Sequence, residues 1–227
     1  MSKTVLVGGS KGIGAALLPK LLEQGPVVNL SRNAPEVTHD HLEHRSVDII
    51  QDEIPVLEDV SRVVYCPGSI NLKPFRSLKP DDFQAEFDIN VKGAVRVIQA
   101  YEKSLKKSGN GSIVMFSTVA VGQGMPFHAS VAAAKGAVEG LVRSLAAEFA
   151  PKIRVNAIAP TITDTPLAAG LLRNEQAVEK AQERHPLKRI VNPDEIADMA
   201  AFLLSDKAAS ISGQVIGIDA GLSTLRP

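Results

Sequence analysis

The sequence has almost no cysteine, no excess of charge of either sign and no long hydrophobic run. With Cys66 as its only cysteine, the chain can form neither an intrachain disulfide nor a metal site of cysteine ligands, and we expect no metal. The 25 basic and 25 acidic residues cancel, which argues against nucleic acid or an anionic membrane as a partner. No apolar run approaches the ~20 residues of a membrane helix, and no signal-peptide pattern is present. We therefore expect a cytoplasmic protein.

Short apolar runs alternate with segments of helical periodicity along all 227 residues, a length that suits one α/β domain. We predict strands over residues 4–8, 27–31, 45–49, 62–66, 112–116, 153–159 and 215–218. We predict helices over residues 13–24, 80–90, 91–107, 130–149 and 192–205, the last capped by Asn192. The polar segment 33–44 is predicted to be a loop. Strands separated by crossover helices indicate a parallel sheet covered on both faces.

A glycine-rich segment, Gly8-Gly9-Ser10-Lys11-Gly12-Ile13-Gly14, joins the first strand to the first helix. Glycines allow a tight turn and the close approach of a pyrophosphate, while the helix start offers N–H groups and the positive end of its dipole. The alternative is a glycine-rich turn without a ligand, but the position between strand and helix favours a dinucleotide. The residues expected to bind it are Gly8, Ser10, Lys11, Gly12, Ile13 and Gly14.

The spacing of these glycines resembles the short-chain dehydrogenase/reductase family, and the resemblance extends over the whole chain. Its further motifs are Asp48-Ile49, Pro67-Gly68, Asn90-Val91-Lys92-Gly93, Ile113–Ser117 with Thr118, Arg154–Pro160 and Gly213–Gly221. Two departures stand out: Tyr65-Cys66 replace asparagines of the family, and Val131 replaces the tyrosine of Tyr-x-x-x-Lys. The resemblance implies one Rossmann-type domain over residues 1–227, with a doubly wound parallel sheet in three layers.

The same resemblance implies the rest of the dinucleotide site. Asp48 would touch the adenine, and the remaining contacts would come from Pro67, Gly68, Asn90, Lys135, Pro160, Thr161 and Ile162. After the second strand, Ser31-Arg32-Asn33 offers no carboxylate that would repel a 2′-phosphate, and Arg32 can bind phosphate in a forked geometry. Together with Lys11 this predicts NADP(H) rather than NAD(H), unless both are ordinary surface cations.

In this family a tyrosine exchanges the proton, and a lysine four residues later binds the nicotinamide ribose. A serine thirteen residues before the tyrosine binds the substrate oxygen, and an asparagine holds a water chain. By that count Lys135, Thr118 and Asn90 keep their implied roles, whereas Val131 cannot transfer a proton. Glu139, one helical turn after Lys135, could pair with this lysine instead.

Three side chains could supply the missing acid. His128 lies seven residues before Lys135, the spacing of the tyrosine in the enoyl reductase branch of the superfamily, and imidazole titrates near neutrality. The alternative for His128 is a structural role in the loop before the helix. Ser117 and Ser130 are further hydroxyls. The alternative for Ser117 is to support a residue of the site without touching the substrate, and the alternative for Ser130 is a helix cap.

Three functions stay open: reduction of a carbonyl, reduction of an activated C=C bond, and NADP(H) binding without chemistry, as in a sensor or scaffold. Dienoyl-CoA reductases, which resemble this family, also lack the tyrosine. Retention of Asn90, Thr118 and Lys135 favours an oxidoreductase that transfers hydride to a small molecule. The resemblance also implies a substrate lid near residues 163–190 and a homodimer or homotetramer through the helices over 91–107 and 130–149.

Overall fold

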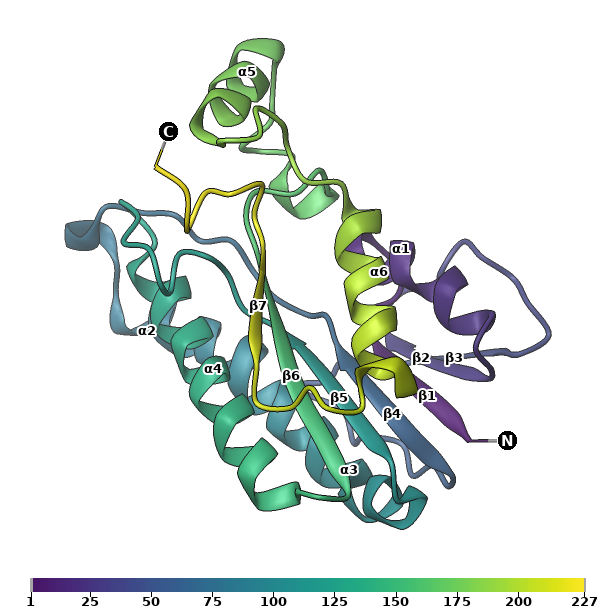
Figure 1. Ribbon diagram of the computed structural model, residues 1–227. Helices are drawn as coiled ribbons and strands as arrows, with labels where there is room; N and C mark the ends of the chain where they lie inside the picture. The colour runs from purple at the N-terminus through teal and green to yellow at the C-terminus, as the bar shows by residue number, and fades with distance from the viewer. Residues whose placement is uncertain (1, 227) are drawn as a thin grey trace.

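The computed structural model describes residues 2–226 as a seven-stranded parallel sheet (Figure 1). The strands are β1 (Lys3–Val7), β2 (Val27–Ser31), β3 (Leu42–Ser46), β4 (Val60–Tyr65), β5 (Gly111–Phe116), β6 (Ile153–Pro160) and β7 (Val215–Ile218). Their order is β3-β2-β1-β4-β5-β6-β7, and every pairing is parallel. The order reverses between β1 and β4, which is where doubly wound sheets bind ligands beyond the carboxyl ends of their strands. The Rossmann-type fold is confirmed.

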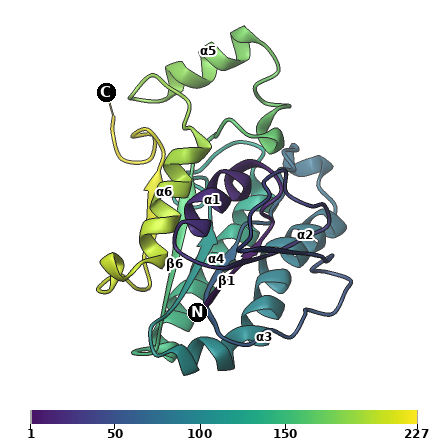
Figure 2. The same cartoon turned by 90° about the vertical axis from the view of Figure 1, so that its right-hand side faces the viewer.

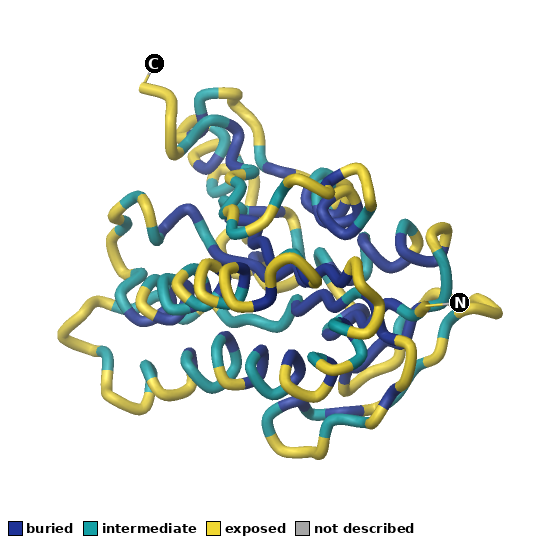
Figure 3. The backbone as a smooth tube through the Cα atoms, turned by 60° about the horizontal axis from the view of Figure 1, so that its bottom comes forward, coloured by how far each residue is buried: buried dark blue, intermediate teal, exposed yellow. Residues whose placement is uncertain are grey.

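Helices cover both faces of the sheet, so the three layers are confirmed (Figures 1 and 2). The helices are α1 (Gly12–Leu22), α2 (Pro80–Phe87), α3 (Gly93–Ser108), α4 (Ala129–Phe149), α5 (Glu175–Arg184) and α6 (Pro193–Leu204). One apolar core joins α1 and α6 to the sheet, and a second joins α3 and α4 to its other face. Buried residues therefore concentrate on the strands and on the inward turns of the helices (Figure 3).

The third strand begins earlier than the predicted 45–49. It covers Leu42–Ser46 and pairs with β2 from Val27↔Leu42 to Ser31↔Ser46. Because β3 is an edge strand and is nowhere fully buried, polar side chains such as Glu43 suit it. The apolar residues Val47 and Ile49, which motivated the prediction, are buried in the core after the strand ends.

The two helices predicted over 80–90 and 91–107 are one helical segment with a local widening. A π-turn, Asp88–Lys92, joins α2 directly to α3, and Asn90 lies at its centre. Such turns insert one residue into a helix and often occur at functional sites. The sequence analysis also missed α5, whose first turn is capped by the side chain of Asn174. The cap of α6 by Asn192 is confirmed.

The carboxyl ends of the central strands and α5 lie at the same end of the molecule (Figure 1). Within residues 2–226 no helix is both long and apolar enough to span a membrane. The same residues contain no group of three or more histidine, cysteine, aspartate or glutamate side chains that could hold a metal ion.

Candidate active site

The glycine-rich loop after β1 has a backbone that favours glycine. Gly8 and Gly12 have φ angles of +84° and +55°, in the left-handed region. A Cβ on Gly14 would collide with the carbonyl oxygen of Gly8, so the helix starts directly against the loop. The amide of Gly9 donates a 2.9 Å hydrogen bond to Oδ1 of the buried Asn29 on β2, which fixes the loop to the sheet.

The start of α1 has the features of an anion-binding site. Lys11 occupies the N-cap position with extended backbone and makes no side-chain cap, and the first turn contains no acidic residue. The first N–H groups of a helix lack intrahelical partners and lie at the positive end of its dipole. The predicted residues Ser10 to Ile13 therefore fit a pyrophosphate.

The adenine side of the site lies at the ends of β2 and β3. The backbone of Arg32 is held by a hydrogen bond from the Ser46 hydroxyl to its carbonyl at 3.1 Å, while its side chain is exposed. Lys11 is exposed as well, and in the described part of the chain neither cation forms an ion pair with a carboxylate. Asp48 Oδ1 accepts a hydrogen bond from the amide of Ile50 at 2.9 Å, so one oxygen of the carboxylate stabilises the local turn.

Asn90 and Lys135 meet beside Gly68. A Cβ built on Gly68 would lie 3.3 Å from both Lys135 Nζ and Asn90 Oδ1. Lys135 is 8% exposed, and its Nζ donates a 2.9 Å hydrogen bond to the carbonyl of Phe116 at the end of β5. Asn90 is 1% exposed, and its Oδ1 is a buried acceptor without a partner in the described structure. The structure thus brings together the two predicted residues and leaves an acceptor available to water or ligand.

Burial lowers the pKa of Lys135 to about 8, because desolvation disfavours the ammonium. The nearby carboxylate of Glu86 opposes this shift. Cys66 also lies near Lys135, but burial raises the pKa of its thiol to about 12, so this side chain is neutral at pH 7. Lys135 therefore has one charged neighbour among the groups that shift its pKa, and it titrates close to neutrality.

Thr118 and Val131 complete the predicted catalytic set. Val131 is 6% exposed and offers no proton. Thr118 is half-buried, and its Oγ1 accepts only a long 3.3 Å bond from the amide of Ala120. Glu139 accepts from the Ser117 hydroxyl at 2.8 Å and pairs with Arg143 at 3.2 Å. The suggested pairing of Glu139 with Lys135 is therefore wrong.

His128 is the N-cap residue of α4 and is half-buried. Its Nδ1 lies 2.7 Å from the carbonyl of Pro126, so this nitrogen carries a proton and donates it to the carbonyl in a hydrogen bond. Among residues 2–226 no hydrogen bond joins His128 to Asn90, Thr118 or Lys135. The suggestion that Ser130 caps the helix is wrong, because it lies inside α4 with its buried hydroxyl unpartnered.

The segment after β6 reaches back over the glycine-rich loop. Pro160 ends the strand, the amide of Thr161 donates to the Ile218 carbonyl at 3.3 Å, and Ile162 follows half-buried. A Cβ on Gly12 would lie 3.4 Å from the side chain of Thr165. The predicted residues of this segment therefore lead from the end of β6 to Thr165, which lies next to the glycine-rich loop.

Sequence analysis missed a buried histidine that ties this segment to α5. His185 is 1% exposed, and its Nε2 lies 2.9 Å from the hydroxyl of Thr161. Its Nδ1 lies 2.5 Å from the carbonyl of Ala181 on α5, so Nδ1 is the donor and Nε2 accepts from Thr161. A histidine in a polar loop gives no periodic signal that would have identified this contact.

Two residues that contact the Asn90 turn were also missed. Glu86 is 2% exposed, and its Oε2 accepts from the Asn90 amide at 2.9 Å and from the Ser69 hydroxyl at 2.6 Å. Tyr65 is buried under the π-turn and donates its hydroxyl proton to the carbonyl of Ile89. The spacing of Glu86, four residues before Asn90 on a helix, is the signal that could have located it.

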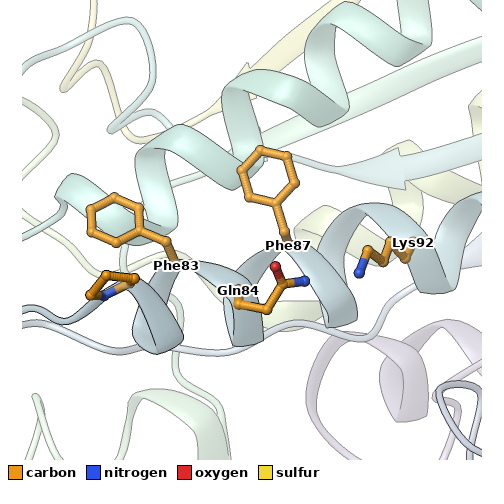
Figure 4. Close-up of a pocket in the computed structure, with 5 residues that line it drawn as sticks. Phe83, Gln84, Phe87 and Lys92 are labelled. Carbon is orange, nitrogen blue, oxygen red and sulfur yellow. The ribbon is translucent and has the colours of Figure 1, made fainter.

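A shallow pocket of about 400 Å³ lies on α2, and none of the predicted site residues lines it (Figure 4). Its lining consists of Pro80, Phe83, Gln84, Phe87 and Lys92. Phe83 and Phe87 rise from α2 toward α4, which contacts α2. The candidate active site therefore lies away from this pocket, at the carboxyl ends of β1, β4, β5 and β6.

Known proteins are similar to this chain in sequence and in fold. Residues 36–223 match the family described as enoyl-(acyl carrier protein) reductase. A 3alpha-hydroxysteroid dehydrogenase of Mediterraneibacter gnavus is 31% identical over 95% of this chain and 94% of its own. The 3-oxoacyl-(acyl-carrier-protein) reductase FabG of Thermotoga maritima is 32% identical over 96% of each chain.

A solved structure of a tyrosine-to-phenylalanine variant of ElxO with NADPH bound is also similar. It has a TM-score of 0.89 and 26% identity, and the match covers 99% of this chain and 100% of that chain. The family match covers most of the chain, and the two relatives match almost end to end. The chain belongs to the short-chain dehydrogenase/reductase family of NAD(P)-dependent oxidoreductases.

Proposed function

We propose that this protein is an NADP(H)-dependent oxidoreductase that transfers a hydride to the carbonyl or activated C=C bond of a small molecule. The observation that carries this proposal is the buried meeting of Asn90 and Lys135 beside Gly68. Burying a lysine is costly, so its presence here favours a functional role. A buried lysine with a perturbed pKa beside an unpartnered acceptor is characteristic of a catalytic site.

The preference for NADP(H) rests on the end of β2. Arg32 and Lys11 are exposed cations, and no carboxylate follows β2 to repel a 2′-phosphate. The similarity to a structure with NADPH bound supports the same choice. The glycine-rich loop would hold the pyrophosphate, Asp48 would lie near the adenine, and residues Pro67-Gly68 and Pro160-Thr161-Ile162 would border the nicotinamide half.

When bound, the nicotinamide ring supplies or accepts the hydride. Lys135 would hold the ribose through its ammonium, and Asn90 Oδ1 would accept from an ordered water. Thr118 would donate its hydroxyl proton in a hydrogen bond to the substrate oxygen, where negative charge develops. Since Val131 cannot supply a proton, the proton comes from water or from His128. Reduction of an activated C=C bond depends least on a proton donor at the substrate oxygen, because the enolate that forms needs only to be stabilised there.

Residues 163–190 are proposed as the substrate lid. The segment contains α5, which projects at the carboxyl end of the sheet in both views, and exposes Leu167, Leu171 and Leu187 (Figures 1 and 2). Its two ends are fixed by the Thr163↔Val191 bridge and by the His185–Thr161 hydrogen bond. A segment held at its ends and apolar between them can cover a substrate and exclude water.

We also infer a homodimer or homotetramer formed through α3 and α4. Ala133 and Gly140 are exposed on α4, and a Cβ on Gly140 would meet no neighbouring atom. Small exposed residues allow a second helix to approach closely. Light scattering coupled to size-exclusion chromatography should give two or four times the monomer mass, whereas the monomer mass would contradict this inference.

The experiment that tests the function follows NADPH fluorescence and absorbance with the purified protein. We expect NADPH to bind at least about tenfold more tightly than NADH, which corresponds to 1.4 kcal/mol. We expect turnover with at least one class among ketones, aldehydes, enones and enoyl thioesters, and its loss in Lys135→Met. Tight NADPH binding without turnover of any class would instead support the second candidate, a sensor or scaffold without chemistry, which the absence of a proton donor at Val131 favours.

A further inference from the structure

The Asn90–Lys135 cluster contains a carboxylate that the proposed reaction does not yet use. Glu86, on the last turn of α2, is 2% exposed. Its Oε2 accepts hydrogen bonds from Asn90 Nδ2 at 2.9 Å and from the Ser69 hydroxyl at 2.6 Å. Asn90 Nδ2 also donates to the Glu86 carbonyl at 2.9 Å, so both amide protons are directed at this residue.

This arrangement determines which way the Asn90 amide faces. An asparagine amide can be turned by 180°, and its partners decide which end is the donor. The carboxylate and the carbonyl of Glu86 can only accept, so they require the NH₂ end. Oδ1 is thereby directed to the other side, where a Cβ on Gly68 would lie 3.3 Å from it and from Lys135 Nζ.

A second consequence of Glu86 is its charge. Its two side-chain partners, Asn90 and Ser69, are neutral donors, and no ion pair involves Glu86 among residues 2–226. A buried carboxylate without a cation in contact is costly, and an apolar residue would stabilise the fold more. The charged group that gains from its presence is Lys135, whose ammonium the carboxylate favours.

We propose that Glu86 is a positioning residue of the hydride-transfer site, which directs Asn90 Oδ1 toward Lys135 and supplies the negative charge that keeps this lysine an ammonium. The proposal rests on the proposed function, in which Lys135 and Asn90 hold the nicotinamide ribose and a water. Glu86 acts through these two side chains and contacts neither dinucleotide nor substrate.

The neighbours of Lys135 on every adjacent element define what else could affect its charge. They are Glu86 of α2, Asn90 of the π-turn, Cys66 after β4 and the Phe116 carbonyl of β5. On α4 itself, the carboxylate of Glu139 is occupied by Ser117 and Arg143. Glu86 is the charged member of this set, so removal of its charge should be visible at Lys135.

The test is a direct titration of Lys135 by NMR of protein labelled with carbon-13 lysine. The Lys135 signal is assigned by its loss in Lys135→Arg. In Glu86→Gln, which keeps the acceptor oxygen but removes the charge, we expect the midpoint to fall by about one pH unit. Glu86→Asp keeps the charge and should restore most of the shift, and Glu139→Gln is the matched control with an unchanged midpoint. An unchanged midpoint in Glu86→Gln would overturn the proposal.

A second measurement separates this proposal from the proposed function. At pH 7.5 we expect NADPH to bind about three- to tenfold more weakly to Glu86→Gln than to the wild type, because less of Lys135 is charged. Wild-type affinity in a folded Glu86→Gln would count against a positioning role. If the wild type itself binds no NADPH, the proposed function fails, while the titration of Lys135 still decides the role of Glu86.

Discussion

Replacement of Tyr65 with phenylalanine tests whether the π-turn that carries Asn90 is held in place by the sheet beneath it. Tyr65 is 3% exposed, and its hydroxyl donates a 2.5 Å hydrogen bond to the carbonyl of Ile89, one residue before Asn90. Tyr65→Phe keeps the ring and removes this bond, which should cost about 1 kcal/mol of the free energy of unfolding. In a chain of this length that lowers the melting temperature by roughly 2–4 °C.

The same substitution should also reduce turnover. Without the bond, the Ile89 carbonyl can rotate, and the adjoining Asn90 moves with it. A misplacement of ~1 Å in groups that align a substrate can cost ~100-fold, so for a smaller shift we expect kcat/KM to fall about tenfold. Thermal unfolding followed by circular dichroism and NADPH absorbance at 340 nm would measure the two effects separately.

Tyr101 is a matched control, because it is the other tyrosine of the chain and makes the same kind of bond. It is fully buried on α3, and its hydroxyl donates to the Pro55 carbonyl at 2.7 Å, away from Asn90. Tyr101→Phe should show the same fall in melting temperature and wild-type kcat/KM. The reasoning is refuted if Tyr65→Phe loses the stability but keeps full activity, or if both variants lose activity equally.

Three further substitutions or conditions probe the dinucleotide site. Gly14→Ala should abolish NADPH binding in a fluorescence titration, because its Cβ would collide with the Gly8 carbonyl. Arg32→Glu should weaken NADPH binding at least about tenfold and leave NADH affinity unchanged or improved, since a carboxylate repels the 2′-phosphate. An equal loss of affinity for both nucleotides would contradict the preference for NADP(H). Burial lowers the pKa of Lys135 to about 8, so the cation is present below that pH and lost as the pH rises through it; NADPH should bind about tenfold more weakly at pH 9 than at pH 7.

The parts of the fold that the sequence predicted are those where local chemistry and burial agree. The strand Val27–Ser31 is an example, because it is buried along its whole length and three of its five residues are apolar. The glycine-rich loop was equally easy to predict, because Gly8 and Gly12 adopt positive φ angles and a Cβ on Gly14 would collide with the Gly8 carbonyl. The start of the last helix was predicted from Asn192, which caps it, and from Pro193 at its first position.

Other parts depend on tertiary contacts that leave no periodic signal. The edge strand Leu42–Ser46 is set by its pairing with β2 and not by its own hydrophobicity. At the π-turn Asp88–Lys92, the carbonyl of Ile89 accepts a hydrogen bond from Tyr65 of another element, a contact that helical periodicity does not show. Glu86 was not predicted either, because an acidic residue in a polar helix is expected to face solvent, and only the structure shows that it is buried.

The sequence predicted which residues form the candidate site, but it did not predict how their side chains contact one another. The resemblance named Asn90 and Lys135, but their meeting beside Gly68, with Oδ1 unpartnered, follows from the packing of β4, α2 and α4. The separation of Glu139 from Lys135 has a similar origin, because the Ser117 hydroxyl and Arg143 occupy the carboxylate. His128 stays a candidate acid, with its Nδ1 held by the Pro126 carbonyl.

The most direct test of hydride transfer without the family tyrosine uses NADPH deuterated at C4 of the nicotinamide, in both stereochemical forms. The protein would be incubated with a panel of ketones, aldehydes, enones and enoyl thioesters, and the products analysed by mass spectrometry. The account predicts that one form delivers deuterium to carbon of a product, and that Lys135→Met does not. Tight NADPH binding with no deuterium in any product would contradict it.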